Sequence, residues 1–279
     1  MASDSDRDWD LCFETINKLV DEAGKIIASR NSGAKTISEK TDDIDLLTET
    51  DQQVEKLLTE NLHAKFPSHK FIGEEAFGEG NKSQLTDDPT WIIDPVDGTM
   101  NFVHSFPQSC VSVGLWVNKS PELAIVFNPV FNQKFTARRG QGAYYNGQKI
   151  HVSGEKNIKK ALITTEFGTS RDPDKVRVTL ENLAKVVPAV HGIRVTGSAA
   201  LNMCMVAQGA ADLNYEFGPH AWDMAAGDLI VREAGGVTMD PSGGPLDIMS
   251  RRVLAASSQE LAEDFIKLLT QFYPQPRDD

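Results

Sequence analysis

Asp94 and Asp97 are the residues of this chain whose types and spacing most directly suggest chemistry. They lie in the stretch WIIDPVDGTMNF, residues 91–102, where acids and a proline interrupt an apolar run. The two carboxylates, a backbone carbonyl between them and the Thr99 hydroxyl beyond are oxygen ligands of the kind that Mg²⁺ prefers, commonly together with a substrate phosphate. The pattern therefore favours a site for a hard divalent cation.

Other interpretations of this stretch exist. A turn built on Asp94 and Pro95, with an ordinary side-chain cap, competes with the metal site when the stretch is considered alone. An EF-hand is excluded because the required acids are absent at alternate positions before Gly98. Phosphatases that form an aspartyl-phosphate place two acids at i and i+2. Here the acids stand at i and i+3, so a covalent phospho-aspartate is not predicted.

The elements around these acids are expected to be short and buried. Residues 90–93 are apolar and β-branched, which favours a strand that Pro95 should stop because proline has no N–H to donate. A strand over 70–73 should end in Glu74 and Glu75. Helices are expected over 9–27 and from a Thr50-x-x-Gln53 capping box to residue 66, which puts Asp51 in a first helical turn.

The pattern of expected strands and helices changes near residue 155. The first half continues with strands over 110–117, 122–130 and 134–138 and a hairpin at Asn146-Gly147. The second half alternates strands over 161–165, 191–196, 212–217 and 253–257 with helices over 176–187, 201–208 and 222–234. A last helix should be capped by Ser257-x-x-Glu260 and ended by Pro274. We expect an α/β protein that forms one unit over 1–279, with an α+β subdomain over about 1–155 and an α/β subdomain over about 156–279.

Composition excludes several classes of partner. The net charge of −12 argues against nucleic acid and against an anionic membrane. An acidic protein that handles phosphate needs positive charge from elsewhere, which bound metal ions would supply. Cys12, Cys110 and Cys204 form neither a disulfide framework nor a zinc spacing, and no signal peptide or long apolar run is visible. We expect a cytoplasmic protein.

Two helix starts in the second half carry groups that ligands use. Gly197 and Ser198 should offer unpaired N–H groups to an anion, although an ordinary N-cap is the alternative. Asp223 follows the expected strand over 212–217 and opens a helix, where it could equally complement the helix dipole. Ligands of open α/β sheets gather at such strand and helix ends.

Three motifs in order resemble the inositol monophosphatase family, the magnesium-dependent, lithium-sensitive phosphatases. They are Gly73-Glu74-Glu75, residues 91–102 and Trp222-Asp223-x-Ala225-Ala226-Gly227. The resemblance covers nearly the whole chain, including residues 47–51, 146–147, 197–204 and 233–236. It implies a layered αβαβα sandwich like that of sugar phosphatases, and a homodimer.

The resemblance also implies a set of site residues. One metal would be bound by Glu74, Asp94 and the Val96 carbonyl, a second by Asp94, Asp97 and Asp223, and a third, weaker one near Glu74 through water. Two to three Mg²⁺ ions would thus act, with Li⁺ as an inhibitor. Thr99, with Glu74 and Asp51, would orient the attacking water. The implied substrate contacts are Glu74, Asp97, Gly98, Thr99, Thr169, Gly197, Ser198, Ala199, Glu216 and Asp223.

Glu216 bears on which substrate is bound. A carboxylate can accept hydrogen bonds from two ring hydroxyls but repels a second phosphate, which favours an inositol monophosphate. A bisphosphatase for fructose 1,6-bisphosphate or adenosine 3′,5′-bisphosphate is the first alternative; it should place Lys or Arg there, and residues 216–223 offer only His220. A catalytically silent metal-binding scaffold is the second, against which the intact acid set argues. Met100 could narrow the pocket but removes no ligand. Lys40 lies in a polar loop that matches a loop shielding the site in relatives, although a solvated surface charge is the favoured interpretation.

Overall fold

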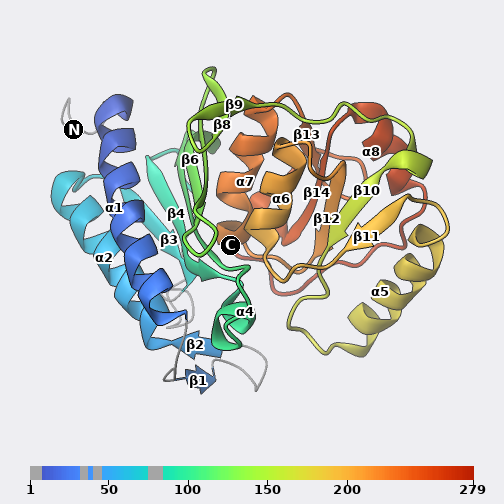
Figure 1. Cartoon of the computed structure of the whole chain (residues 1–279), viewed down its shortest axis with the longest axis horizontal. Coiled ribbons are helices and arrows are strands. Elements are labelled where there is room, and N and C mark those ends of the chain that lie inside the picture. The colour runs from blue at the N-terminus through green and yellow to red at the C-terminus, as the bar shows by residue number, and fades with distance from the viewer. Residues whose placement is uncertain (1–7, 32–36, 40–45, 75–83) are drawn as a thin grey trace.

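The computed structural model describes residues 8–31, 37–39, 46–74 and 84–279. Five layers follow one another across the molecule: two helices, a seven-stranded sheet, two helices, a five-stranded sheet and two helices (Figure 1). The predicted αβαβα sandwich is confirmed. Lys40 and Glu75 lie outside the described residues.

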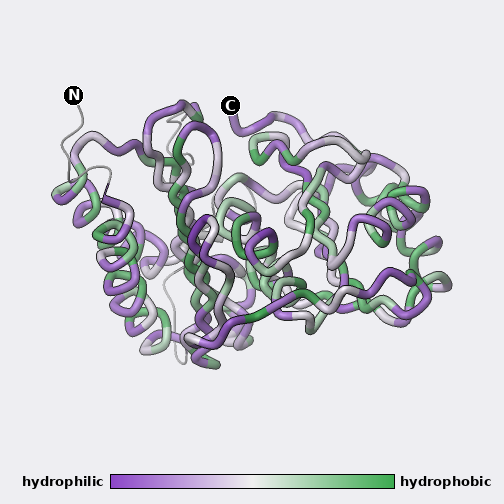
Figure 2. Tube along the Cα trace, turned by 90° about the horizontal axis from the view of Figure 1, so that it is seen from above, coloured by the Kyte–Doolittle hydropathy of each residue, from purple (hydrophilic) through white to green (hydrophobic). Residues whose placement is uncertain are grey.

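Helices α1 (Trp9–Arg30) and α2 (Glu49–Lys65) form the first layer. Seen from above, the coils of these helices alternate between hydrophilic and hydrophobic residues (Figure 2). Their apolar stripes, which include Val20, Ile27 and Leu58, pack on Trp91 and Ile93 of the sheet. A stripe at helical spacing therefore meets one face of a strand whose side chains alternate between faces. A two-stranded ribbon of β1 (Ile37–Glu39) and β2 (Leu46–Thr48) precedes α2.

The large sheet has the strand order β3-β4-β5-β6-β7-β8-β9, with only the β3–β4 pair parallel. Its strands are β3 (Lys70–Gly73), β4 (Thr90–Asp97), β5 (Cys110–Val117), β6 (Ser120–Asn128), β7 (Gln133–Arg138), β8 (Gly142–Tyr145) and β9 (Gln148–Ile150). The hairpin predicted at Asn146-Gly147 joins β8 to β9, where both residues have positive φ.

Helices α6 (Ala199–Ala207) and α7 (Ala221–Glu233) are buried between the two sheets. Gly114 of β5 allows α7 to approach closely, because a Cβ there would lie 3.2 Å from the Ala225 backbone. Beside it, the Trp116 indole N–H donates to the Ala225 carbonyl at 3.2 Å. The layer that carries Asp223 is therefore held tightly against the sheet that carries Asp94 and Asp97.

The second sheet has the order β11-β10-β12-β14-β13, in which β11, β10 and β12 are parallel and the other pairs antiparallel. Its strands are β10 (Leu162–Thr165), β11 (Gly192–Arg194), β12 (Leu213–Phe217), β13 (Val237–Met239), which was not predicted, and β14 (Arg252–Ala256). Helices α5 (Pro173–Val186) and α8 (Gln259–Ile266) cover its outer face, and short 3₁₀ turns stand at Ile158–Lys160 and Ile248–Ser250.

Several predicted boundaries are wrong, and three of them have a clear local reason. Strand β4 continues through Pro95 to Asp97, because the proline lies in an irregularity of the ladder where no N–H is needed. The capping box of α2 uses Thr48 and Asp51 rather than Thr50 and Gln53. Helix α8 is capped by Ser258 and ends at Ile266, well before Pro274. Among the described helices, none is both long and apolar enough to span a bilayer.

Candidate active site

Asp94, Asp97 and Asp223 come together between the large sheet and α7. One carboxylate oxygen of each lies within 4.8 Å of the others. The ladder irregularity of β4 explains how two acids three residues apart share a face of the sheet. Asp94 pairs with Ser112 and Asp97 with Cys110, so three residue steps on β4 oppose two on β5. The extra residue reverses the alternation and turns Asp97 to the side of Asp94.

Hydrogen bonds orient each of these carboxylates. Asp94 Oδ1 accepts from its own Val96 N–H at 2.9 Å. Asp97 Oδ2 accepts from the Ala200 N–H at 2.9 Å and from the Ser198 hydroxyl, which ties β4 to the start of α6. In α7, Asp223 Oδ2 accepts from the His220 N–H at 2.7 Å. At least one oxygen of each acid is thus held in place by the protein, and Asp94 and Asp223 also interact with each other.

Burial raises the pKa of all three acids. For Asp94 the charges of Glu74, Asp97 and Asp223 add to burial, and the rise is large. Burial and the charge of Asp223 raise the pKa of Asp97 to about 7, against the opposing hydrogen bond from Ser198. Burial also raises the pKa of Asp223, opposed by the charge of His220. Crowded carboxylates without a counter-charge are unfavourable, so the cluster fits a divalent cation that takes oxygen ligands.

Glu74 and Val96 extend this cluster. Glu74 directly follows β3, which runs parallel to β4, and its charge acts on both Asp94 and Asp223. The Val96 carbonyl accepts a hydrogen bond from the Thr99 hydroxyl at 3.0 Å. Both residues are therefore placed beside the three acids, as the sequence resemblance implies.

Thr99 and Asp51 also meet, although 48 residues separate them. Thr99 begins the short helix α4 (Thr99–Val103), and its hydroxyl lies 3.4 Å from Asp51 Oδ1. Asp51 is fully buried, and its other oxygen accepts from the Thr48 N–H at 3.0 Å and from the Thr48 hydroxyl. The capping box of α2 thus fixes the carboxylate that faces Thr99.

Gly98 makes the junction between the two halves possible. Its φ of 83° is left-handed, and a Cβ would lie 2.8 Å from the Gln108 carbonyl and 2.9 Å from the Gly197 carbonyl. Nearby, the Asn101 side-chain amide donates to the carbonyls of Gln108 and Thr196, both at 2.8 Å. Only glycine fits here without strain.

The expectation of unpaired N–H groups at Gly197 and Ser198 is wrong. Glu166 Oε1 accepts from the Gly197 N–H at 2.7 Å and from the Thr196 N–H at 2.8 Å, while Ser198 caps α6 with its side chain. The anions at this helix start are the chain's own Glu166 and Asp97, and Ala199 follows as the first helical residue. The sequence prediction did not include Glu166. This residue directly follows strand β10, and acids at the ends of strands were the expected site residues.

Glu216 stands near the end of β12, and only 5% of its surface is exposed. Burial raises its pKa well above the usual range, with further contributions from Glu166 and Asp223, while Lys175 opposes the rise. Because the charges of Asp223 and Asp97 both contribute to the raised pKa, Glu216 lies near the acid cluster. Thr169 lies in the exposed loop between β10 and α5.

Asp278 supports the start of α7 from the far end of the sequence. It is 3% exposed, and its carboxylate accepts from the Ala221 N–H at 2.8 Å and lies 2.7 Å from His220 Nδ1. The His220 ring in turn stacks on Trp222, with centroids 4.5 Å apart. Nothing in the sequence pattern indicated that Asp278 would contact the turn that carries Asp223.

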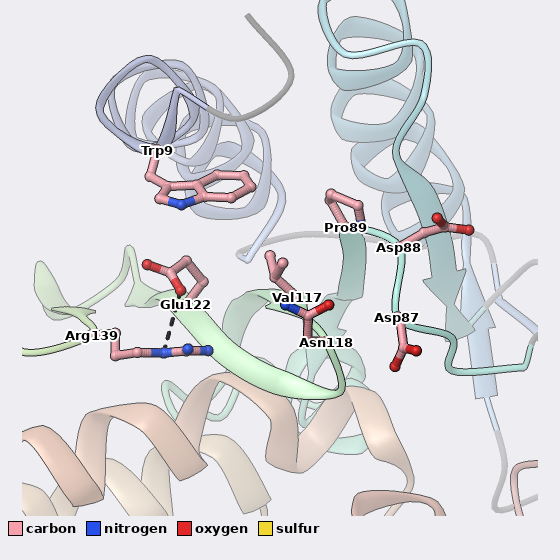
Figure 3. A pocket seen from close by; sticks show the side chains of 8 residues that line it. All are labelled: Trp9, Asp87, Asp88, Pro89, Val117, Asn118, Glu122 and Arg139. Carbon is pink, nitrogen blue, oxygen red and sulfur yellow. Dashed lines mark ion pairs between the residues drawn. The ribbon is translucent and has the colours of Figure 1, made fainter. Parts of the chain in front are cut away.

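A cavity of about 310 Å³ opens at the other end of β4, beside Trp9 and Pro89 (Figure 3). Asp87, Asp88 and Glu122 make its lining acidic, and its one cation, Arg139, is paired with Glu122 at 3.3 Å. Pro89 precedes Asp94 by five residues of an extended strand, or about 16 Å. This cavity is therefore neither near the acid cluster nor suited to a phosphate.

The fold and the acid cluster define a layered αβαβα protein with a candidate metal centre between its large sheet and α7. The family model described as "Inositol monophosphatase family" matches residues 8–272. The chain therefore belongs to the inositol monophosphatase family, and it is a phosphoric monoester hydrolase.

Individual relatives support this family assignment. The chain is 50% identical over 273 residues to inositol monophosphatase 1 of Pongo abelii, covering 97% of this chain and 98% of that protein. It is 50% identical over 255 residues to inositol monophosphatase 2 of Mus musculus, covering 91% and 88%. Among solved structures, the extragenic suppressor protein suhB of Bartonella henselae superimposes with a TM-score of 0.83 at 28% identity, covering 93% of this chain and 98% of that one.

Proposed function

We propose that this chain hydrolyses inositol monophosphates to free inositol and phosphate with Mg²⁺ as cofactor. The observation that carries the proposal is the buried cluster of Asp94, Asp97 and Asp223, in a chain that is half identical to inositol monophosphatases over nearly its whole length. Glu216, which lies near the cluster, suits a polyol on the leaving-group side of the phosphate.

The proposed metal ligands are Glu74, Asp94, the Val96 carbonyl, Asp97 and Asp223. Two or three bound Mg²⁺ ions would supply Lewis acidity, acidify a water molecule and neutralise the charge of the phosphate. The ligand oxygens are held by α7, β3 and β4, which belong to packed layers, so their spacing is preorganised before any ligand binds.

Thr99 and Asp51 are the proposed positioning pair for the attacking water. The Thr99 hydroxyl has one proton to donate, and both the Val96 carbonyl and Asp51 lie within reach as acceptors. Its lone pairs are then free to accept a hydrogen bond from water and to aim that water at phosphorus. Water adds to phosphorus, the bond from phosphorus to the ester oxygen breaks, and inositol leaves with a proton.

The proposed substrate contacts surround this position. Gly98 and Thr99 would hold the phosphate through their N–H groups at the start of α4, together with Glu74, Asp97 and Asp223 through bound metal. The inositol ring would lie toward Thr169, Glu216 and the segment of Gly197, Ser198 and Ala199. Because the Gly197 N–H already donates to Glu166, we assign that segment chiefly the role of holding Asp97.

Phosphate release tests the proposal. Inositol 1-phosphate, fructose 1,6-bisphosphate and adenosine 3′,5′-bisphosphate are compared with and without Mg²⁺, with Asp94→Asn as the control that removes a shared ligand charge. We expect a preference for the inositol ester that is lost without Mg²⁺ and in Asp94→Asn. A preference for either bisphosphate would overturn the substrate, and activity in Asp94→Asn would overturn the metal site.

A bisphosphate remains the second candidate because a lysine lies near Glu216. The structure brings Lys175 of α5 close enough to Glu216 to act on its pKa, so the wall near Glu216 does contain a cation that residues 216–223 lack. Glu166 and Asp223 act on the same carboxylate with negative charge, whereas Arg251 and Arg171 act on Lys175 with positive charge. The repulsion between the Glu216 carboxylate and a second phosphate is the reason to prefer a monophosphate.

We further propose the properties that follow from this family membership. Li⁺ should inhibit by occupying the second metal position, and equal activity with and without millimolar Li⁺ would contradict this. The chain should act as a homodimer in the cytoplasm, a reducing compartment that suits its buried free thiols Cys12, Cys110 and Cys204. Residues 1–155 and 156–279 should behave as subdomains of one cooperative unit, because α6 and α7 pack against the first half.

A further inference from the structure

Lys175 is a buried cation that the proposed chemistry does not use. It lies in the first turn of α5, which Asp172 caps, and only 5% of its surface is exposed. Lysine is almost never buried to this degree unless its ammonium is paired. Among the described residues, however, no hydrogen bond or ion pair joins Lys175 Nζ to another group.

Two glycines make room for this ammonium. A Cβ at Gly168 would lie 2.5 Å from Lys175 Nζ, and a Cβ at Gly218 would lie 2.8 Å from it. Both glycines have positive φ, and they belong to the loops that follow β10 and β12. The ammonium is thus enclosed at the carboxyl ends of two parallel strands, which is where open α/β sheets bind ligands.

Glu216 offers the matching unpaired group. Its Oε2 is buried and has no hydrogen-bond partner among the described residues. Glu216 and Lys175 act on each other's pKa, yet no hydrogen bond or ion pair connects them. A buried ammonium and a buried carboxylate therefore lie near each other without a hydrogen bond between them, in the neighbourhood of Asp223.

We propose that Lys175 is a specificity-determining residue of this active site, and that its ammonium and the Glu216 carboxylate bind the same ring hydroxyl of the substrate. This inference rests on the proposed function. A hydroxyl donates one hydrogen bond and accepts two, so it can donate to Glu216 and accept from Lys175 at once. A second phosphate would satisfy only the ammonium and leave Glu216 facing a like charge.

The test compares two substrates. Inositol 1-phosphate carries ring hydroxyls, whereas para-nitrophenyl phosphate carries none. Lys175→Met keeps the length of the side chain and removes the charge. It should lower kcat/KM for inositol 1-phosphate by about 10- to 100-fold, the usual cost of a hydrogen bond to a charged group, and change that for para-nitrophenyl phosphate by about twofold or less. Lys185→Met, at an exposed position of the same helix, is the matched control and should change neither.

Glu216→Gln provides a second, independent arm should Lys175→Met fold poorly, which circular dichroism would reveal. It should show the same selective loss, and the double variant should lose less than the product of the two single losses, because both groups bind one hydroxyl. Equal losses on both substrates, or strictly multiplicative losses, would overturn the inference in favour of a structural role.

The remaining outcomes separate this inference from the proposed function. Unchanged kinetics of Lys175→Met on inositol 1-phosphate would overturn the inference and leave the function standing. A wild-type enzyme that ignores inositol 1-phosphate would overturn both. A wild-type preference for fructose 1,6-bisphosphate that Lys175→Met abolishes would instead assign the ammonium to a second phosphate.

Discussion

Replacing Asp278 should disturb the proposed metal site, although Asp278 lies far from Asp223 in the sequence. The Asp278 carboxylate receives the Ala221 N–H at 2.8 Å and contacts His220 Nδ1 at 2.7 Å, at the turn that begins α7. Asp278→Ala leaves the buried Ala221 N–H without a partner, which costs about 1–3 kcal/mol, and removes the contact to His220. We expect the free energy of unfolding to fall by about 2–4 kcal/mol.

The effect on function follows from the position of Asp223 in the same turn. Because His220 also donates its N–H to Asp223, a looser turn places this ligand less well. Loss of a group that supports metal ligands typically weakens metal binding by about 10- to 100-fold. The Mg²⁺ concentration for half-maximal activity should therefore rise by about tenfold or more in Asp278→Ala.

Urea denaturation and a Mg²⁺ titration of activity measure the two effects. Asp279→Ala is the matched control, since Asp279 pairs only with the exposed Arg277 among the described residues and should change stability by about 0.5 kcal/mol or less. If Asp278→Ala unfolds with the wild-type midpoint and needs no more Mg²⁺ than the wild type, the assigned support of α7 is refuted.

Three further predictions concern Ser198, Gly98 and Asp228, which lies in α7. Ser198→Ala removes the hydroxyl that donates to Asp97, so Mg²⁺ affinity in the same titration should fall by about tenfold, and an unchanged affinity would contradict this. Gly98→Ala should lower the free energy of unfolding by more than about 1 kcal/mol, because its φ of 83° and the Gln108 carbonyl 2.8 Å away resist a Cβ; unaltered thermal unfolding would argue otherwise. Burial raises the pKa of Asp228. The folded protein therefore gains stability from the protonated Asp228 carboxyl below the usual pKa near 4, and this stability is lost as pH rises through the raised pKa. Relative to the wild type, the non-titrating Asp228→Asn should thus gain stability as pH rises above about 4, and a pH-independent difference in urea titrations would refute the assignment.

Local patterns determined much of the fold. The apolar stripes of α1 and α2, the alternation along β5 and the Asn146-Gly147 hairpin are confirmed because each depends on residues close in sequence. Ser258 and Thr48 were missed because neighbouring hydroxyl residues satisfy the same capping pattern. Strand β13 was missed because three residues carry too little periodicity to stand out.

Some features of the site were likewise predictable from the sequence, and others depend on the tertiary structure. The sequence by itself predicted that Asp94, Asp97 and Asp223 gather, since they stand in motifs that resemble the family, and the structure brings these three acids together. The sequence could not show that an irregularity in β4 turns Asp97 to the side of Asp94, because that depends on the register with β5. Nor could it show that Glu166 occupies the N–H groups of Gly197 and Thr196.

The long-range partners were decided by tertiary structure alone. Asp278 contacts α7 and Lys175 lies near Glu216, although the local sequence of neither segment predicts a role in the site. Burial raises the energetic cost of leaving these charges unpaired. A charge that costs little in water must find a partner once packed layers enclose it, and only the fold determines which partner it meets.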